Sequence, residues 1–228
     1  MNKKYYMLEQ NGNQANLSIY GDITSWPWLE SDVSAFSLTK ELESLDAEEI
    51  NVYINSYGGE VAEGLAIYNA LKRHKAKINT FCDGVACSIA SVIFMAGDER
   101  IMSPASLLMI HNAWTCASGN AQELRKQADD LEVITSASVA AYTEKVSITE
   151  EEVKELMDAE TWIDAKTALQ KGFATKIIDG QGENPSQHLQ TRIFEALTAK
   201  GEKKEKKEPE PKEPQKEKNK FIKFFENY

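Results

Sequence analysis

The stretch Gly84-Val85-Ala86-Cys87-Ser88-Ile89-Ala90 decides the interpretation of this 228-residue chain. A strand-like run, 78–82, leads into it, and an apolar segment of small residues, 91–97, follows. A serine between a strand and a helix is a common position for a nucleophile, because the sharp turn exposes its hydroxyl and the next backbone N–H can stabilise an oxyanion. Taken alone, the pattern also fits tight packing before a buried helix, so the flanking sequence has to decide.

Apolar residues at regular spacing on both sides of this stretch predict alternating strands and helices. The predicted strands are 15–20, 50–55, 78–82, 106–110 and 173–178; the predicted helices are 31–45, 60–74, the segment after Ser88, 119–146, 148–157 and 165–171. This alternation predicts βαβ units and a mainly parallel sheet covered by helices, the α/β fold class. The helix 119–146 has polar ends, which is compatible with projection from the body. Thr149 followed by Glu152 predicts a capping box, and Gly172 is expected to end the last helix.

Composition divides the chain into five segments. A polar, flexible N-terminal segment (1–14) precedes a folded domain (15–180), a polar helical extension (181–200), a Lys/Glu/Pro linker (201–220) and an aromatic tail (221–228). The linker cannot bury a core and is expected to be disordered. The tail is either a disordered apolar end or a docking peptide on a flexible tether.

Charge and composition argue against several classes of function. The net charge is −10, and the acidic excess lies outside 201–220, where eight Lys stand against six Glu. Phosphate binding needs a concentrated basic surface, so nucleic acid is not an expected partner. The longest apolar run, 85–97, is shorter than the roughly 20 residues of a membrane-spanning helix, and no signal peptide is apparent. We expect a cytoplasmic protein with no membrane contact, reduced cysteines, no metal and no cofactor.

A serine nucleophile needs a general base, and the chain has three histidines. His74 lies among three basic side chains, whose charges disfavour the neutral imidazole that accepts a proton. His188 lies in the polar region near the tail. His111 follows the apolar run 107–110 and emerges at the end of a buried strand, where the active sites of parallel sheets gather. Elimination makes His111 the candidate base; the alternative is a structural histidine at a strand end.

The turn Asn55-Ser56-Tyr57-Gly58-Gly59 is a second strand-to-helix connection. Its glycines allow another backbone to come close, so its N–H groups are candidate oxyanion donors. The alternative is an ordinary turn between a strand and a helix. No G-x-G-x-x-G or Walker pattern supports phosphate binding, and no G-x-S-x-G surrounds Ser88, which argues against an α/β-hydrolase.

Three runs together resemble the Clp-type serine peptidases, the family of the ClpP proteolytic subunit. They are Ile54-Asn55-Ser56-Tyr57-Gly58-Gly59, Gly84-Val85-Ala86-Cys87-Ser88 and Met109-Ile110-His111-Asn112, in this order and at family-like separations. The resemblance covers roughly residues 15–180 and is closer to the phage and prophage branch of head-maturation proteases than to the housekeeping subunit. The chain departs from the family at two places. The family carries proline where Tyr57 stands, and it usually carries a small residue where the segment 112–114 begins.

The resemblance implies the ClpP fold, a crotonase-like βαβ spiral, with a projecting helical handle formed by the long helix after Gly119. It implies Ser88 as nucleophile and His111 as general base. The N–H groups of Gly59 and Ile89 would be the oxyanion donors.

The third member of the triad is open between several acids. An ungapped alignment on Gly172 puts the family's aspartate at Glu160, a departure, although a glutamate can orient a histidine through the same hydrogen bond. Asp158 is the alternative if the segment is extended. Asp164 is a further alternative, as is a site with no acid at all.

The stretch 115–119 matches the region where substrate adds as a strand in the family. This makes Cys116, Ala117 and Ser118, together with Gly58, the implied substrate-binding residues. In the family, the handles interlock two rings of seven subunits, so a heptameric or double-heptameric homo-oligomer is implied.

These observations favour a serine endopeptidase that acts through an acyl-enzyme on unfolded or scaffold-type polypeptide, either without ATP or fed by an AAA+ unfoldase. For the prophage type, capsid or scaffold protein is the expected target. The alternatives are a catalytically silent ring or assembly protein and a crotonase-like acyl-CoA enzyme. Cys87 is a competing nucleophile, but it stands one residue early in the motif.

Overall fold

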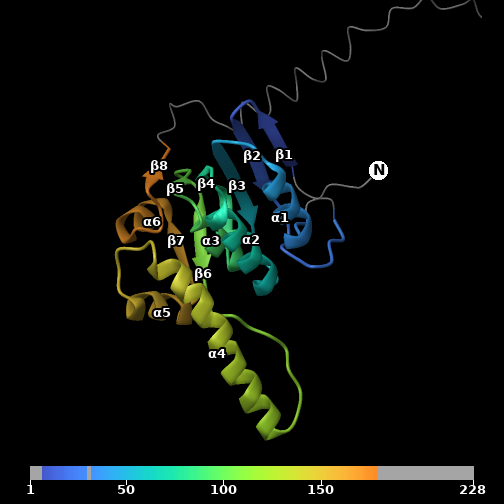
Figure 1. Cartoon of the computed structure of the whole chain (residues 1–228). Helices are drawn as coiled ribbons and strands as arrows, with labels where there is room; N and C mark the ends of the chain where they lie inside the picture. Colours follow the sequence, from blue (N-terminus) through green and yellow to red (C-terminus); the bar gives the residue numbers. More distant parts are fainter. Residues whose placement is uncertain (1–6, 30–31, 179–228) are drawn as a thin grey trace, which may run out of the picture. The chain divides into compact units, whose positions relative to one another are not determined.

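The predicted alternation of strands and helices folds into one mixed sheet with six helices in the computed structural model, which describes residues 7–29 and 32–178 (Figure 1). The elements in chain order are β1 (Met7–Asn11), β2 (Gln14–Ile19), α1 (Ala35–Ser44), β3 (Glu49–Ser56), α2 (Val61–Arg73), β4 (Lys77–Cys87), α3 (Ile89–Phe94), β5 (Glu99–Met102), β6 (Leu107–Ile110), α4 (Ala121–Thr143), α5 (Glu150–Asp158), β7 (Thr161–Asp164), α6 (Ala165–Lys171) and β8 (Lys176–Ile177). The predicted α/β fold class is confirmed.

The centre of the sheet is parallel, as predicted. Strands β2, β3, β4 and β5 pair in parallel, and β8 continues the sheet beside β5. The long strand β4 has two partners: its first half pairs with β5, and its last residues, 85–87, pair in parallel with β6. Strand β7 then adds antiparallel to β6. Strand β4 therefore joins both groups of strands, and Ser88 follows directly after the part of β4 that pairs with β6.

Alternating burial along the strands explains why the sheet forms. In β3 the inward residues Ile50, Val52 and Ile54 are fully buried, whereas their neighbours remain partly accessible. Such period-two burial places one face of a strand on a core. Every residue of α3 is buried as well, which fixes the helix that begins directly after Ser88.

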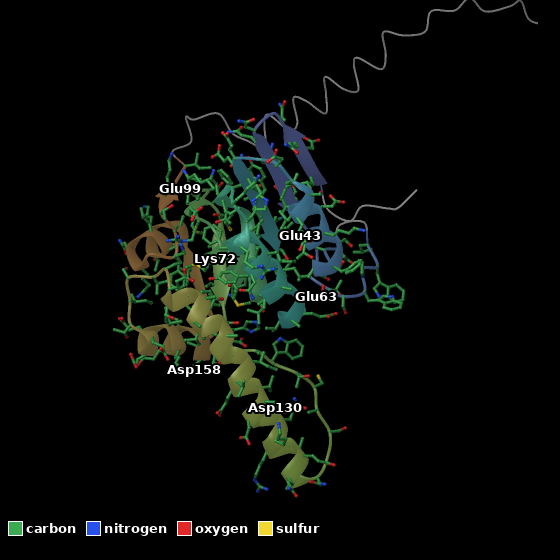
Figure 2. All side chains as sticks on the ribbon, viewed as in Figure 1. Glu43, Glu63, Lys72, Glu99, Asp130 and Asp158 are labelled. Atoms are coloured by element: carbon green, nitrogen blue, oxygen red, sulfur yellow. The ribbon has the colours of Figure 1, made fainter. Side chains whose placement is uncertain are left out.

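The helix α4 is the projecting element anticipated from the sequence (Figure 1). Its last turns carry its buried residues, including Val139 and Tyr142, whereas its earlier turns are largely exposed and carry Asp130 away from the body (Figure 2). Asn120 and Glu123 form a capping box at its start. The helices of residues 7–29 and 32–178 are too short or too polar to cross a membrane.

Several local predictions need correction. The segment 1–14 was expected to be irregular, but residues 7–11 form β1, which pairs antiparallel with β2 across a turn at Gly12. The strand predicted at 173–178 is reduced to the two residues of β8, and β5 and β7 were not predicted. The extension 181–200, the linker 201–220 and the tail 221–228 lie outside the described residues.

Candidate active site

Ser88 sits at the sharp junction between β4 and α3 that the sequence indicated. Its backbone has φ 53° and ψ −129°, and its N–H donates to the carbonyl of Met109 at 2.8 Å. A positive φ is uncommon for a residue with a Cβ and persists only where the surroundings hold it. A strained turn of this kind exposes the hydroxyl at the end of the strand.

His111 meets Ser88 because the strands that precede the two residues are neighbours. The parallel pairing of β4 with β6 sets Cys87 opposite Met109, so both strands end at the same edge. The Nε2 atom of His111 lies 2.7 Å from Oγ of Ser88, and the imidazole side chain is 11% exposed. Among the histidines considered, His74 instead accepts a hydrogen bond from the N–H of Ala76, and His188 lies outside the described residues.

Of the three acids considered for the triad, Glu160 is the one that reaches the imidazole. Its Oε1 lies 3.7 Å from Nδ1 of His111, and its side chain is 77% exposed. The other two acids serve different partners: Asp158, at the end of α5 (Figure 2), accepts a hydrogen bond from the side chain of Asn112 at 2.7 Å, and Asp164 caps α6. The antiparallel register of β6 and β7 brings Glu160 beside His111, and Glu160 itself has φ 48°.

The glycine turn lies against the nucleophile. Both Gly58 (φ 101°) and Gly59 (φ 146°) have positive φ, and a Cβ added to Gly58 would come within 2.8 Å of the Cβ of Ser88. The N–H of Gly58 donates to the hydroxyl of Ser56. The N–H of Ile89 is at the first helical position of α3, where backbone N–H groups have no partner in their own helix. Of the two predicted donors, Ile89 directly follows Ser88, and Gly59 follows the glycine that lies against it; among the described residues neither N–H has a backbone acceptor.

Two side chains that support these turns were missed from the sequence. The Oδ1 of Asn55 accepts the backbone N–H of Val85 at 3.2 Å, which joins the glycine turn to β4. A carboxylate oxygen of Glu60 accepts the hydroxyls of Thr24 and Ser25 at 2.9 and 3.0 Å, and the hydrogen bond from Ser25 lowers the pKa of Glu60. For Asn55, the only signal in the sequence was its position next to the glycine pair. For Glu60, there was no signal in the sequence.

The predicted substrate-binding stretch runs along the surface after His111. Cys116, Ala117 and Ser118 are exposed, and the N–H of Ala113 donates to the hydroxyl of Thr135 on α4 at 3.1 Å. This contact holds the chain just before the stretch against α4. The role of the stretch in substrate binding stays a prediction.

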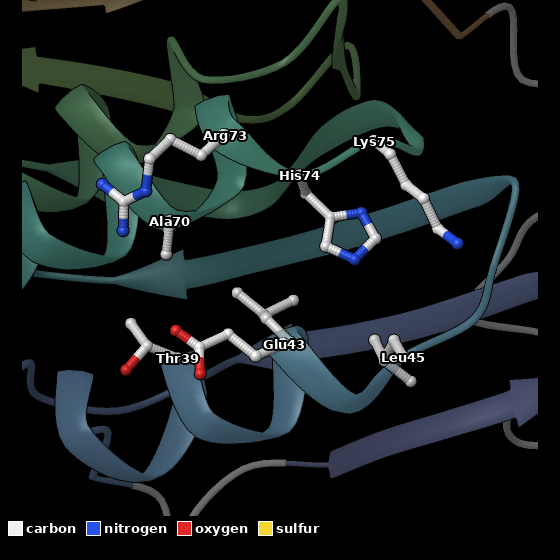
Figure 3. A pocket seen from close by; sticks show the side chains of 8 residues that line it. Thr39, Glu43, Leu45, Ala70, Arg73, His74 and Lys75 are labelled. Carbon is white, nitrogen blue, oxygen red and sulfur yellow. The ribbon is translucent and has the colours of Figure 1, made fainter.

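Two competing features do not join the site. The thiol of Cys87 is buried, and burial raises its pKa to about 11, so it is protonated at neutral pH. A groove of about 290 Å³ between α1 and α2 includes His74 but none of the residues proposed for catalysis (Figure 3). It is lined by Thr39, Leu42, Glu43, Leu45, Ala70, Arg73, His74 and Lys75.

A serine hydroxyl in contact with an imidazole, with a carboxylate on the far side of the ring and the N–H of the next residue at a helix start, is the arrangement typical of serine hydrolases. Comparison with known proteins narrows the class: the model of the Clp protease family matches residues 30–181. The ATP-dependent Clp protease proteolytic subunit of Deinococcus radiodurans is 35% identical over 156 residues, which cover 66% of this chain and 76% of that protein. The protein of the same name from Chlorella vulgaris is 33% identical over 139 residues, or 58% and 69% of the two chains.

The chain therefore belongs to the Clp protease family. Members of this family are serine proteases that form oligomeric rings and act on polypeptides, so the expectation of a ClpP-type serine protease is confirmed at this level. The narrower assignment to the phage head-maturation branch stays a prediction.

Proposed function

We propose that this protein is a serine endopeptidase that cleaves polypeptides through an acyl-enzyme, with Ser88 as nucleophile and His111 as general base. The observation that carries the proposal is the 2.7 Å separation between Oγ of Ser88 and Nε2 of His111. This distance is within the reach that a general base needs to remove the hydroxyl proton.

The reaction would proceed in two halves. Oγ of Ser88 attacks the scissile carbonyl carbon while Nε2 of His111 takes its proton, and a tetrahedral oxyanion forms. The imidazolium then protonates the departing amine, the C–N bond breaks, and the acyl group remains on Ser88 as an ester. Water, deprotonated by the same imidazole, attacks the ester; the C–O bond to Ser88 breaks and its oxygen recovers the proton.

The surrounding groups would stabilise the charges that develop. The N–H groups of Gly59 and Ile89 are available to the oxyanion, and such preorganised donors are a large part of catalysis in acyl transfer. Nε2 accepts a proton from Ser88 only when the imidazole carries its own proton on Nδ1, the atom that faces Glu160. The carboxylate of Glu160 would thus favour the reactive tautomer and the imidazolium.

The substrate we propose is an extended polypeptide that adds as a strand beside Cys116, Ala117 and Ser118, with its scissile carbonyl close to Gly58. Exposed backbone is what such strand addition requires. Further proposals that follow from the resemblance are a heptameric or double-heptameric ring built through α4, a cytoplasmic location, and capsid or scaffold protein as target, cleaved either without ATP or with an AAA+ unfoldase as partner.

A catalytically silent ring or assembly protein is the second candidate. It is favoured by the wide 3.7 Å gap between Glu160 and His111 and by the exposure of Glu160. The crotonase-like alternative has no comparable support, since acyl-CoA chemistry does not need a serine and a histidine in contact.

A fluorophosphonate probe tests the proposal directly, because it esterifies only an activated serine hydroxyl. We expect labelling at Ser88, none in Ser88→Ala and strongly slowed labelling in His111→Ala, while His74→Ala reacts as the wild type does. Light scattering on the eluting protein reports ring assembly in the same samples. Assembled protein that neither reacts with the probe nor cleaves a peptide would refute the peptidase and favour the silent ring.

A further inference from the structure

A buried pair of hydroxyls connects α4 to the nucleophile. The hydroxyl of Ser91, on α3, donates to the carbonyl oxygen of Ser88 at 2.6 Å. The phenol oxygen of Tyr142, on α4, lies 2.7 Å from Oγ of Ser91. Both side chains are essentially inaccessible, each 1% exposed.

The direction of this relay follows from proton counting. A serine hydroxyl has a single proton, and that of Ser91 is used on the carbonyl of Ser88. Tyr142 must therefore donate to Ser91, so the chain of hydrogen bonds runs from Tyr142 through Ser91 to Ser88. Complete burial raises the pKa of the phenol, which keeps the Tyr142 donor protonated at working pH.

The carbonyl that ends the relay belongs to a strained residue. It also accepts the backbone N–H of Ser91 at 3.0 Å, so two donors hold it. Fixing this carbonyl fixes ψ of Ser88, which is −129° beside a positive φ. These two dihedral angles orient the Cα–Cβ bond of Ser88 relative to the flanking backbone, and together with χ1 they determine whether Oγ meets His111.

Packing alone does not account for the two hydroxyls. A hydroxyl taken out of water is costly unless it finds a partner, and in this core each finds its partner in the relay. The ring of Tyr142 packs edge-on against Phe173, a contact that phenylalanine would make equally well.

We propose that Tyr142 and Ser91 are positioning residues for the nucleophile: they hold the backbone of Ser88 in the conformation that directs its hydroxyl at His111. The proposal rests on the proposed function of Ser88. According to this proposal, the buried end of α4 also contributes to catalysis, through the hydroxyl of Tyr142.

Tyr142→Phe tests the relay because it removes one oxygen and keeps the ring. We expect kcat for a fluorogenic peptide, and the rate of Ser88 labelling by a fluorophosphonate, to fall about tenfold with KM unchanged, as for the loss of one buried hydrogen bond. Ser91→Ala should lower both at least as much. The double variant should be no slower than Ser91→Ala, because the two hydroxyls act in series.

Tyr68→Phe is the matched control. Its phenol also links α2 to the end of α4, donating to a carboxylate oxygen of Glu144 at 3.1 Å, but among the described residues it has no hydrogen bond to Ser88 or Ser91. It should label and hydrolyse at the wild-type rate. The relay would be overturned if Tyr142→Phe were labelled at the wild-type rate, or if Tyr68→Phe lost as much activity as Tyr142→Phe. If Tyr142→Phe does not fold, the rate of Ser91→Ala alone decides. If the wild-type protein itself were not labelled at Ser88, the proposed peptidase function would fail, and the relay proposal that rests on it would fail with it.

Discussion

Replacing Glu160 by glutamine should slow this peptidase only modestly. The carboxylate is 3.7 Å from Nδ1 of His111, beyond hydrogen-bond distance, and its side chain is 77% exposed. Two unit charges at that separation attract by about 1 kcal/mol in water and by about 4 kcal/mol in a partly buried site. Because Glu160 is exposed, the value for water applies, so the substitution removes about 1 kcal/mol of stabilisation from the imidazolium of the transition state. The expected fall in kcat is about fivefold.

The assay is hydrolysis of a fluorogenic peptide by Glu160→Gln at low and high salt. Because exposed charges are screened, the difference from wild type should shrink towards zero at about 1 M salt, where the Debye length is about 3 Å. Asp158→Asn is the control, since it removes a carboxylate charge two residues away that is bound to Asn112 rather than to His111; its effect should be smaller. A fall of roughly 10³-fold or more, approaching the ~10⁴ of a buried triad acid, would refute the reasoning, because it would require Glu160 to act as a desolvated hydrogen-bonding partner.

Three further perturbations follow from the site and its surroundings. Gly58→Ala should lower peptide hydrolysis by about 100-fold or more, because its Cβ would lie 2.8 Å from that of the nucleophile; Gly12→Ala, at positive φ in open space, should retain full activity. Burial raises the pKa of the Asp83 carboxyl, so its stabilising contribution is complete below the unfolded pKa of about 4 and is lost as the pH rises through the folded pKa. Urea unfolding should therefore show Asp83→Asn gaining stability relative to wild type as the pH rises above the unfolded pKa of about 4, and a difference that stays constant with pH would contradict this assignment. With a thiol pKa of about 11, about one Cys87 in ten thousand is ionised at pH 7; iodoacetamide should leave Cys116→Ser fully active while serine reagents inactivate it, and inactivation by iodoacetamide would restore Cys87 as a rival.

Local sequence signals predicted the parts of the fold that depend on neighbouring residues. Thr149 and Glu152 form the expected capping box, and Gly172 ends α6 in the left-handed conformation, φ 82°. Ser88 lies at the predicted junction of strand and helix, and His111 follows the predicted strand. Each of these depends on spacing within a few residues, which a sequence displays directly.

The missed strands depend on partners that are distant in sequence. Strand β1 has three polar residues among its five, too few apolar positions to predict a strand, and it forms because it pairs with β2 residue by residue. Strand β7 has one buried residue, Ile163, so it carries too little alternation to be recognised. Its register against β6, which sets Thr161 opposite Ile110, depends on tertiary structure, because the two strands are distant in sequence.

That register also explains why the acid of the triad stayed open between Glu160, Asp158 and Asp164. All three lie within seven residues, and spacing alone cannot tell which faces the imidazole. The antiparallel pairing ends at Thr161, and Glu160, the residue before it, lies in a turn at positive φ beside His111, whereas Asp158 is the last residue of α5. A glutamate has one more methylene than the family's aspartate, and this longer side chain ends exposed to solvent. The effect that we expect of Glu160 on the imidazole is therefore limited by its exposed position just before the edge strand β7, and Glu160→Asp would shorten its reach towards Nδ1 without removing the charge.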